Sequence, residues 1–124
     1  MKNKILILCL MVAGCCGGKK ATNQITSEAG GKTATLPACV NDMIKGFASA
    51  EKENPPRKIY SFTYHGKTVY YVTPPCCDFF SDLYDTECKL IGHPDGGITG
   101  KGDGKLVDFN TDRSNEKLVW EDKR

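Results

Sequence analysis

A β-hairpin is the sequence feature that most restricts how this chain can fold. Two runs rich in aromatic and β-branched residues, 59–64 and 67–73, flank the dipeptide His65-Gly66. A two-residue loop with glycine in second place is typical of a type I′ turn, which joins antiparallel strands and sets their register. The predicted partners are Tyr64 with Lys67, Phe62 with Val69 and Tyr60 with Tyr71.

The same register predicts two different faces for the hairpin, because successive side chains of a strand point to opposite sides. One face is aromatic and can be covered by a helix, although an aromatic stripe can also serve as a ligand platform. The other face is more polar. The aromatic face holds Tyr60, Phe62, Tyr64, Val69 and Tyr71, and the other face holds Ile59, Ser61, Thr63, Thr68, Tyr70 and Val72.

An amphipathic helix is predicted ahead of the hairpin. Pro37 suits the first turn of a helix, and the apolar residues that follow it recur at the spacing of one helical face. The helix should end before Asn54, because the residue before a proline is pushed out of the α region. The apolar face consists of Val40, Met43, Ile44, Phe47 and Ala48.

We therefore expect an α+β fold in which one N-terminal amphipathic helix packs on a small antiparallel β-meander that disulfides hold together. After the hairpin, the sequence predicts a short helical turn within 79–84 and a third strand within 88–91. Residues 111–124 are mostly charged, and they either form an edge strand through 118–120 or have no fixed structure. A domain this small buries little apolar surface and commonly needs covalent cross-links.

The start of the chain has the pattern of an export signal. Two lysines precede an apolar run, 5–13, which is shorter than the roughly twenty residues of a membrane-spanning helix. This pattern predicts a cleaved signal peptide. The motif Val12-Ala13-Gly14-Cys15 resembles a bacterial lipobox, and the resemblance implies cleavage after Gly14 and a lipid on Cys15. An ordinary signal peptide with an incidental cysteine is the alternative.

Four parts of the chain are therefore expected: a signal peptide at 1–14, a lipidated N-terminus and flexible tether at 15–35, a small α+β domain at 36–110 and a charged tail at 111–124. The lipid would hold the protein at a membrane of the cell envelope. The formal net charge of +2 comes from the two lysines of the signal. Without them the chain lacks the basic excess that favours nucleic-acid binding, so that class of partner is excluded.

Four of the seven cysteines fall inside the predicted domain, Cys39, Cys76, Cys77 and Cys88. An even number in an exported chain favours disulfides. A bond between the neighbours Cys76 and Cys77 would close a strained ring, so two pairings are expected. They are Cys39–Cys76 with Cys77–Cys88, or Cys39–Cys77 with Cys76–Cys88. A four-thiolate zinc site and a reactive redox cysteine are the alternatives.

Residues 92–104 form a glycine-rich loop with six glycines. Repeated glycine permits positive φ angles and close approach of the backbone. Asp95 and Asp103 could bind calcium through hard carboxylate oxygens, with Asp108 as a third carboxylate. The alternative is a set of tight turns in which the aspartates accept backbone N–H bonds. The candidate ligand residues of this loop are His93, Asp95, Gly96, Gly97, Thr99, Gly100 and Asp103.

Four motifs of the chain occur together in one known family. They are Tyr64-His65-Gly66-Lys67-Thr68-Val69-Tyr70-Tyr71, Cys76-Cys77-Asp78, Leu83-Tyr84-Asp85 and Pro94-Asp95-Gly96-Gly97-Ile98-Thr99-Gly100. With them, the chain resembles an uncharacterised domain family of small lipoproteins of Bacteroidota, from about Leu36 to Phe109. The resemblance implies lipoprotein status and carries no known activity.

The resemblance implies two further points. Many relatives have cysteines near the positions of Gly92 and Leu106, which would hold the base of the glycine-rich loop; this chain lacks both, so its loop is expected to be less constrained. Lipoproteins of the group that reach the cell surface carry acidic residues after the lipidated cysteine. Residues 16–20 contain none, which implies that the protein faces the periplasm.

Three classes of function are consistent with these features. The first is a non-catalytic envelope module that binds a protein or a small ligand, or has a structural role. The second is a calcium-binding module that uses Asp95 and Asp103. The third is an enzyme, either a hydrolase using His93 with Asp95 or a thiol oxidoreductase. The sequence has no nucleophile elbow and no His-Glu metal motif, so the non-catalytic class is expected.

Overall fold

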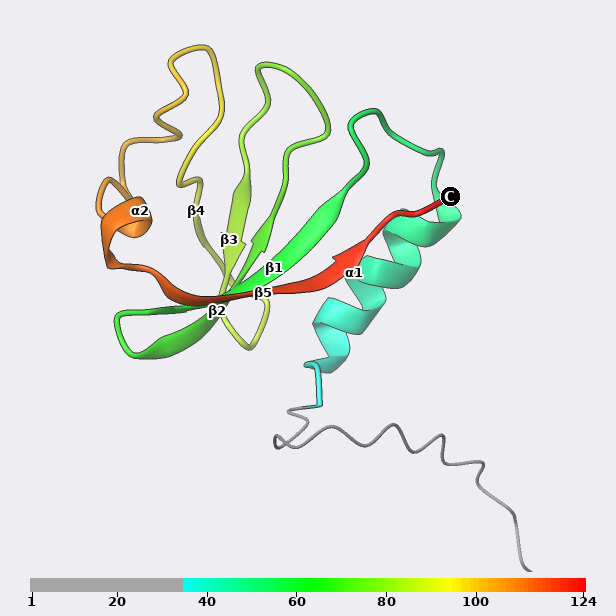
Figure 1. The fold of residues 1–124 in the computed structure, drawn as a ribbon, viewed down its shortest axis with the longest axis horizontal. Coiled ribbons are helices and arrows are strands. Elements are labelled where there is room, and N and C mark those ends of the chain that lie inside the picture. Colours follow the sequence, from blue (N-terminus) through cyan, green and yellow to red (C-terminus); the bar gives the residue numbers. More distant parts are fainter. Residues whose placement is uncertain (1–34) are drawn as a thin grey trace, which may run out of the picture. The chain divides into compact units, whose positions relative to one another are not determined.

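The computed structural model describes residues 35–124 and has the α+β fold that the sequence predicts (Figure 1). Five strands form one sheet in the order β4-β3-β2-β1-β5, and neighbouring strands are antiparallel. The predicted signal peptide, the lipidation site Cys15 and most of the predicted tether lie outside the described residues. The elements are α1 (Ala38–Ser49), β1 (Lys58–Tyr64), β2 (Lys67–Val72), β3 (Asp82–Tyr84), β4 (Leu90–Gly92), α2 (Phe109–Asp112) and β5 (Ser114–Glu121).

The hairpin of β1 and β2 has the predicted register. Tyr64 pairs with Lys67, and the remaining pairs run without a shift to Ile59 with Val72. His65 has φ 48° and Gly66 has φ 74°. Positive φ at both central residues is what a type I′ turn requires, so the turn chemistry of His65-Gly66 explains the register.

The two faces of the hairpin are covered by different parts of the chain. Phe109 of α2 is fully buried against the aromatic face, with its ring 5.3 Å from that of Tyr64 and 5.6 Å from that of Phe62. On the opposite face, Val40 of α1 is fully buried. Its cluster also contains Ile59, Tyr70 and Val72, and the partly buried Met43, Ile44 and Phe47 pack against it.

The expectation that the N-terminal helix would cover the aromatic face is therefore wrong. The apolar side of α1 needs an apolar counterpart, and the end of the hairpin at Ile59 and Val72 provides one on the face that was predicted to be more polar. The aromatic face is instead closed by α2, which the sequence did not predict. Both faces of the sheet are thus covered.

Three segments after the hairpin complete the sheet. The helical turn predicted within 79–84 is wrong, because Leu83 is fully buried between half-buried neighbours, as in a strand, and pairs with Tyr71 of β2. The predicted third strand is present as β4. Of the two alternatives for the C-terminal tail, the structure has the edge strand: β5 pairs with β1, and Trp120 stacks on Phe47 of α1.

All four domain cysteines are in disulfides, but neither predicted pairing is correct. The bonds are Cys39–Cys88 and Cys76–Cys77. Cys76 and Cys77 lie before β3, whereas Cys88 lies in the turn after it, at the opposite end of the sheet. That turn is the part that reaches α1. A four-thiolate zinc site does not fit this arrangement, because none of these four thiols is free.

The end of α1 is held by Arg124, which follows β5. Its guanidinium donates to the carbonyl oxygens of Phe47 and Ala50, each at 2.9 Å. The last carbonyls of a helix lack the usual partners within the helix; these bonds satisfy the carbonyl of the C-cap residue Ala50 and add a second donor to that of Phe47, which also accepts the N–H of Ala50. The buried carboxylate of Asp122 orients Arg124 with a contact of 2.6 Å.

None of the helices formed by residues 35–124 is long and apolar enough to cross a membrane.

Candidate functional site

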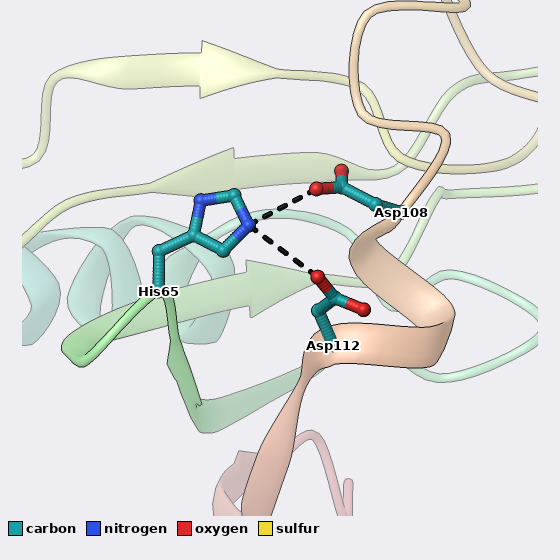
Figure 2. A group of neighbouring side chains, drawn as sticks. All are labelled: His65, Asp108 and Asp112. Atoms are coloured by element: carbon teal, nitrogen blue, oxygen red, sulfur yellow. Dashed lines mark hydrogen bonds and ion pairs between the residues drawn. The ribbon is translucent and has the colours of Figure 1, made fainter.

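His65, Asp108 and Asp112 form a cluster of possible metal ligands between the hairpin turn and α2 (Figure 2). The imidazole points toward both carboxylates: Nε2 lies 3.0 Å from Oδ2 of Asp108 and 3.7 Å from Oδ2 of Asp112. Atoms from all three side chains lie within 4.8 Å of one another. The side chains remain 57%, 40% and 51% exposed, respectively, so solvent and ions can reach them.

The local structure explains why the two carboxylates face the same way. Asp108 and Asp112 are four residues apart around one turn, and residues at this spacing share a face of a helix. Phe109, between them, is buried in the core and fixes the orientation of α2. His65 is brought opposite by the hairpin turn, in which it takes the first central position.

Each carboxylate of the cluster has a hydroxyl group beside it. Tyr64 donates from its hydroxyl to Oδ1 of Asp108 at 2.7 Å. The hydroxyl of Thr111 lies 3.0 Å from Oδ1 of Asp112 and 2.8 Å from the carbonyl oxygen of Asp108, so its one proton is shared between these two acceptors. In both aspartates the second oxygen is therefore the one nearest the imidazole.

The electrostatics of Tyr64 and Asp108 are coupled. Burial raises the pKa of Tyr64 to about 12, and the hydrogen bond and charge of Asp108 add to that effect. Conversely, the hydrogen bond from Tyr64 holds the pKa of Asp108 below its usual value, and His65 lowers it further. At neutral pH, Asp108 is therefore an anion and Tyr64 a neutral hydrogen-bond donor.

A groove of about 630 Å³ adjoins the cluster. It runs between the hairpin and the turn that connects β3 to β4. His65 belongs to both the groove and the cluster, and Tyr64, which also lines the groove, donates a hydrogen bond to Asp108 of the cluster. The other lining side chains include Lys67, Asp85, Thr86 and Ile91, so the groove has charged, polar and apolar walls.

The glycine-rich loop has the backbone that its composition predicts, with positive φ at Gly96, Gly97, Gly100, Gly102 and Gly104. At two positions glycine is required for space as well. A Cβ at Gly102 would lie 1.9 Å from the carbonyl oxygen of His93, and one at Gly96 would lie 2.3 Å from that of Phe79. Hydrogen bonds within the loop also stabilise its turns. Gly100 donates its N–H to the carbonyl of Gly97, and Lys101 donates its N–H to the hydroxyl of Thr99.

The two aspartates proposed for calcium have different hydrogen-bond partners. Asp95 accepts bonds of 2.9 and 3.1 Å from the hydroxyl of Tyr71. Asp103 accepts the backbone N–H groups of Lys105 at 3.0 Å and His93 at 3.3 Å. Within residues 35–124, the group of three or more possible ligands at metal-binding spacing is the His65 cluster, to which neither belongs. Calcium binding by the loop stays a prediction.

The hydrolase hypothesis expected His93 to pair with the carboxylate of Asp95, but His93 has other partners. Its Nδ1 lies 2.9 Å from Oδ1 of Asp82 and 3.0 Å from the carbonyl oxygen of Ser81. The hydroxyl of Ser81 is buried and bonds to the backbone of Asp95 rather than to the imidazole. This arrangement holds the start of the loop on β3.

An apolar tip, which we define as Phe79, Phe80 and Ile98, stands where the loop meets the segment before β3. The side chain of Ile98 is 91% exposed and that of Phe79 is 62% exposed. The two segments are joined by a hydrogen bond from the N–H of Gly97 to the carbonyl of Phe79, and the ring of Phe80 lies against Gly97. The tip is thus apolar, exposed and held by backbone contacts.

Sequence reasoning selected the glycine-rich loop and missed the His65 cluster. The spacing of Asp108 and Asp112 by four residues was a local signal for the two carboxylates of the cluster. The position of His65 beside them depends on a contact with Asp108, 43 residues away. This contact follows from burial of Phe109 on the aromatic face.

The comparison with protein families gives one match. The family model of DUF6970, a domain of unknown function, matches residues 45–122 of the chain. The match begins inside α1 and ends after β5, so it includes the whole sheet. No curated protein and no solved structure matches the chain.

Proposed function

This chain belongs to the DUF6970 family of domains of unknown function, and we propose that it is a non-catalytic binding module tethered to a membrane of the cell envelope. The observation that carries the proposal is the apolar tip. Exposed apolar patches mark sites that bind proteins or membranes. In this domain, two of the three side chains of the tip, Phe79 and Ile98, are more than half exposed.

We assign the apolar tip to a protein partner in the envelope. In Figure 1, the described chain begins beside α1 at the lower edge of the domain, whereas the loops after β2 and β4, which carry the tip, lie at the upper edge. A lipid on Cys15 would anchor the protein through the predicted flexible tether, so membrane attachment would not require the tip. The predicted periplasmic location supplies protein partners for an exposed apolar surface.

The anchor is tested by replacing Cys15 with serine. The wild-type protein should be recovered with membranes and incorporate labelled palmitate, and the Cys15→Ser protein should do neither. Membrane-bound, labelled Cys15→Ser protein would contradict the lipid anchor.

The binding surface is tested by crosslinking in intact cells, with the wild type compared to Ile98→Asp and Phe79→Asp. We expect the wild-type protein to give one crosslinked partner band. Either substitution should lower the intensity of this band at least tenfold. Such a loss corresponds to about 1.4 kcal/mol or more of binding free energy. The matched control is Val107→Asp, since Val107 is 80% exposed but lies outside the tip.

Two results would contradict a protein-binding tip. One is an unchanged partner band in the Ile98→Asp protein. The other is binding of the unlipidated Cys15→Ser protein to vesicles that Ile98→Asp abolishes, because that result would assign the tip to a membrane.

A further inference from the structure

We propose that His65, Asp108 and Asp112 form a binding site for one divalent transition-metal ion of the zinc class. This proposal does not depend on the apolar tip, because the cluster lies between the hairpin turn and α2 (Figure 2). The ligands would be Nε2 of the imidazole and one oxygen of each carboxylate.

The distances between the ligand atoms fit such an ion. Zinc binds histidine nitrogen and carboxylate oxygen at about 2.0–2.2 Å, and tetrahedral geometry then places the ligand atoms about 3.3 Å apart. In the structure, Nε2 lies 3.0 Å from one carboxylate oxygen and 3.7 Å from the other. All three ligand atoms lie within 4.8 Å of one another, so rotation of the exposed side chains would bring them to the required spacing.

The chemical types of the ligands select the class of ion. Calcium and magnesium prefer oxygen ligands alone, whereas an imidazole together with carboxylates suits zinc and its neighbours in the first transition series. Two carboxylates and a neutral imidazole would balance the charge of a divalent ion. Three protein ligands leave one tetrahedral position open, which is typical of zinc sites that bind water or a further ligand.

The surroundings of the cluster also resemble those of a metal site. Metal-binding carboxylates are commonly oriented by outer hydrogen bonds, and here the hydroxyl of Tyr64 holds one oxygen of Asp108. The groove of about 630 Å³ starts at the same imidazole.

The experiment is a titration of the purified, lipidated protein in detergent with zinc chloride, followed by calorimetry. All chains carry Cys16→Ser, so that this thiol cannot bind zinc. The wild-type protein should bind one equivalent. His65→Asn and Asp112→Asn should each weaken binding more than about 100-fold, and Tyr64→Phe, which removes only an outer hydrogen bond, about tenfold.

The variants are chosen to keep the fold. Asparagine is favoured at the first central position of a type I′ turn, so His65→Asn retains the hairpin. Asp78→Asn is the control for the loss of one exposed carboxylate outside the cluster. The chain has two histidines, so the ¹⁵N resonances of His93 serve as an internal control in a parallel NMR titration.

In the NMR titration, only the ring resonances of His65 should change up to one equivalent of zinc. The proposal fails if no saturable binding occurs, or if His93 responds at the same zinc concentration. It also fails if Asp78→Asn weakens binding as much as Asp112→Asn does. Binding that depends on His65 but not on Asp112 would show an adventitious imidazole contact instead.

Discussion

Gly102 lies where the glycine-rich loop passes closest to its own beginning. It has φ 63°, and a Cβ there would meet the carbonyl oxygen of His93 at 1.9 Å. Gly100 has nearly the same φ, 69°, but has nothing within 4 Å of its Cβ position. Comparing substitutions at the two glycines therefore distinguishes the cost of backbone strain, which both share, from the cost of a steric clash, which only Gly102 has.

We predict that Gly102→Ala destabilises the domain more than Gly100→Ala does. Alanine in the left-handed region costs about 1–2 kcal/mol at either position. At Gly102, the displaced backbone adds about 1–3 kcal/mol, as is typical of overpacking. Urea unfolding of both variants measures the difference. Equal losses would mean that the loop moves freely away from the new methyl group.

Asp122 links stability to pH at the end of α1. The hydrogen bonds from Arg124 lower the pKa of Asp122 to about 2, from 3.8 for the free side chain. A carboxyl group with a lowered pKa in the folded state stabilises the fold above its unfolded pKa, and that stabilisation is lost as pH falls through the folded pKa.

We predict that Asp122→Asn lowers the free energy of unfolding at pH 7, and that the difference from wild type shrinks between about pH 4 and pH 2. Part of the loss comes from Arg124, whose bonds to Phe47 and Ala50 depend on its orientation by Asp122. Urea unfolding across this pH range checks the prediction, with exposed Asp78→Asn as the control. A difference that does not vary with pH would contradict it.

Among the structural elements, the two disulfides differ in the length of chain that they close. Cys39–Cys88 joins residues 49 apart, whereas Cys76–Cys77 joins neighbours. In the loop-entropy model, stabilisation grows with the length of the closed loop and is about 4 kcal/mol for a loop of this length. A bond between neighbours closes almost no loop.

We predict that replacing Cys39 and Cys88 together with alanine costs about 2–4 kcal/mol of stability. The matched double replacement of Cys76 and Cys77 should cost less than about 1 kcal/mol, as expected for surface substitutions. Thermal and urea unfolding of the two variants measure both values. A loss from the second variant as large as that from the first would rule out loop closure as the main effect.

The elements that could be predicted from the sequence are those with local signals. The hairpin register follows from His65-Gly66 and the alternation around it, and α1 follows from its apolar spacing and the prolines beyond it. The face that α1 covers could not be predicted, because both faces of the hairpin have apolar side chains. Phe109 occupies the aromatic face, but no periodic pattern of apolar residues around it predicts this.

At the level of the whole molecule, the missing information concerns which end of the sheet each loop reaches. Cys88 lies after β3, whereas Cys76 and Cys77 lie before it, so the strand separates the actual partner of Cys39 from the two partners that the sequence predicted. The His65 cluster has the same origin. Its two halves meet only once α2 packs on the aromatic face.

The Cys39–Cys88 bond also has a mechanical consequence. Cys39 is the second residue of α1, so a pull on the chain ahead of this helix reaches a covalent junction almost at once. The load then passes through Cys88 into the turn between β3 and β4, and not along the hydrogen bonds of the helix. Force applied from that side would load the sheet before it could unwind α1.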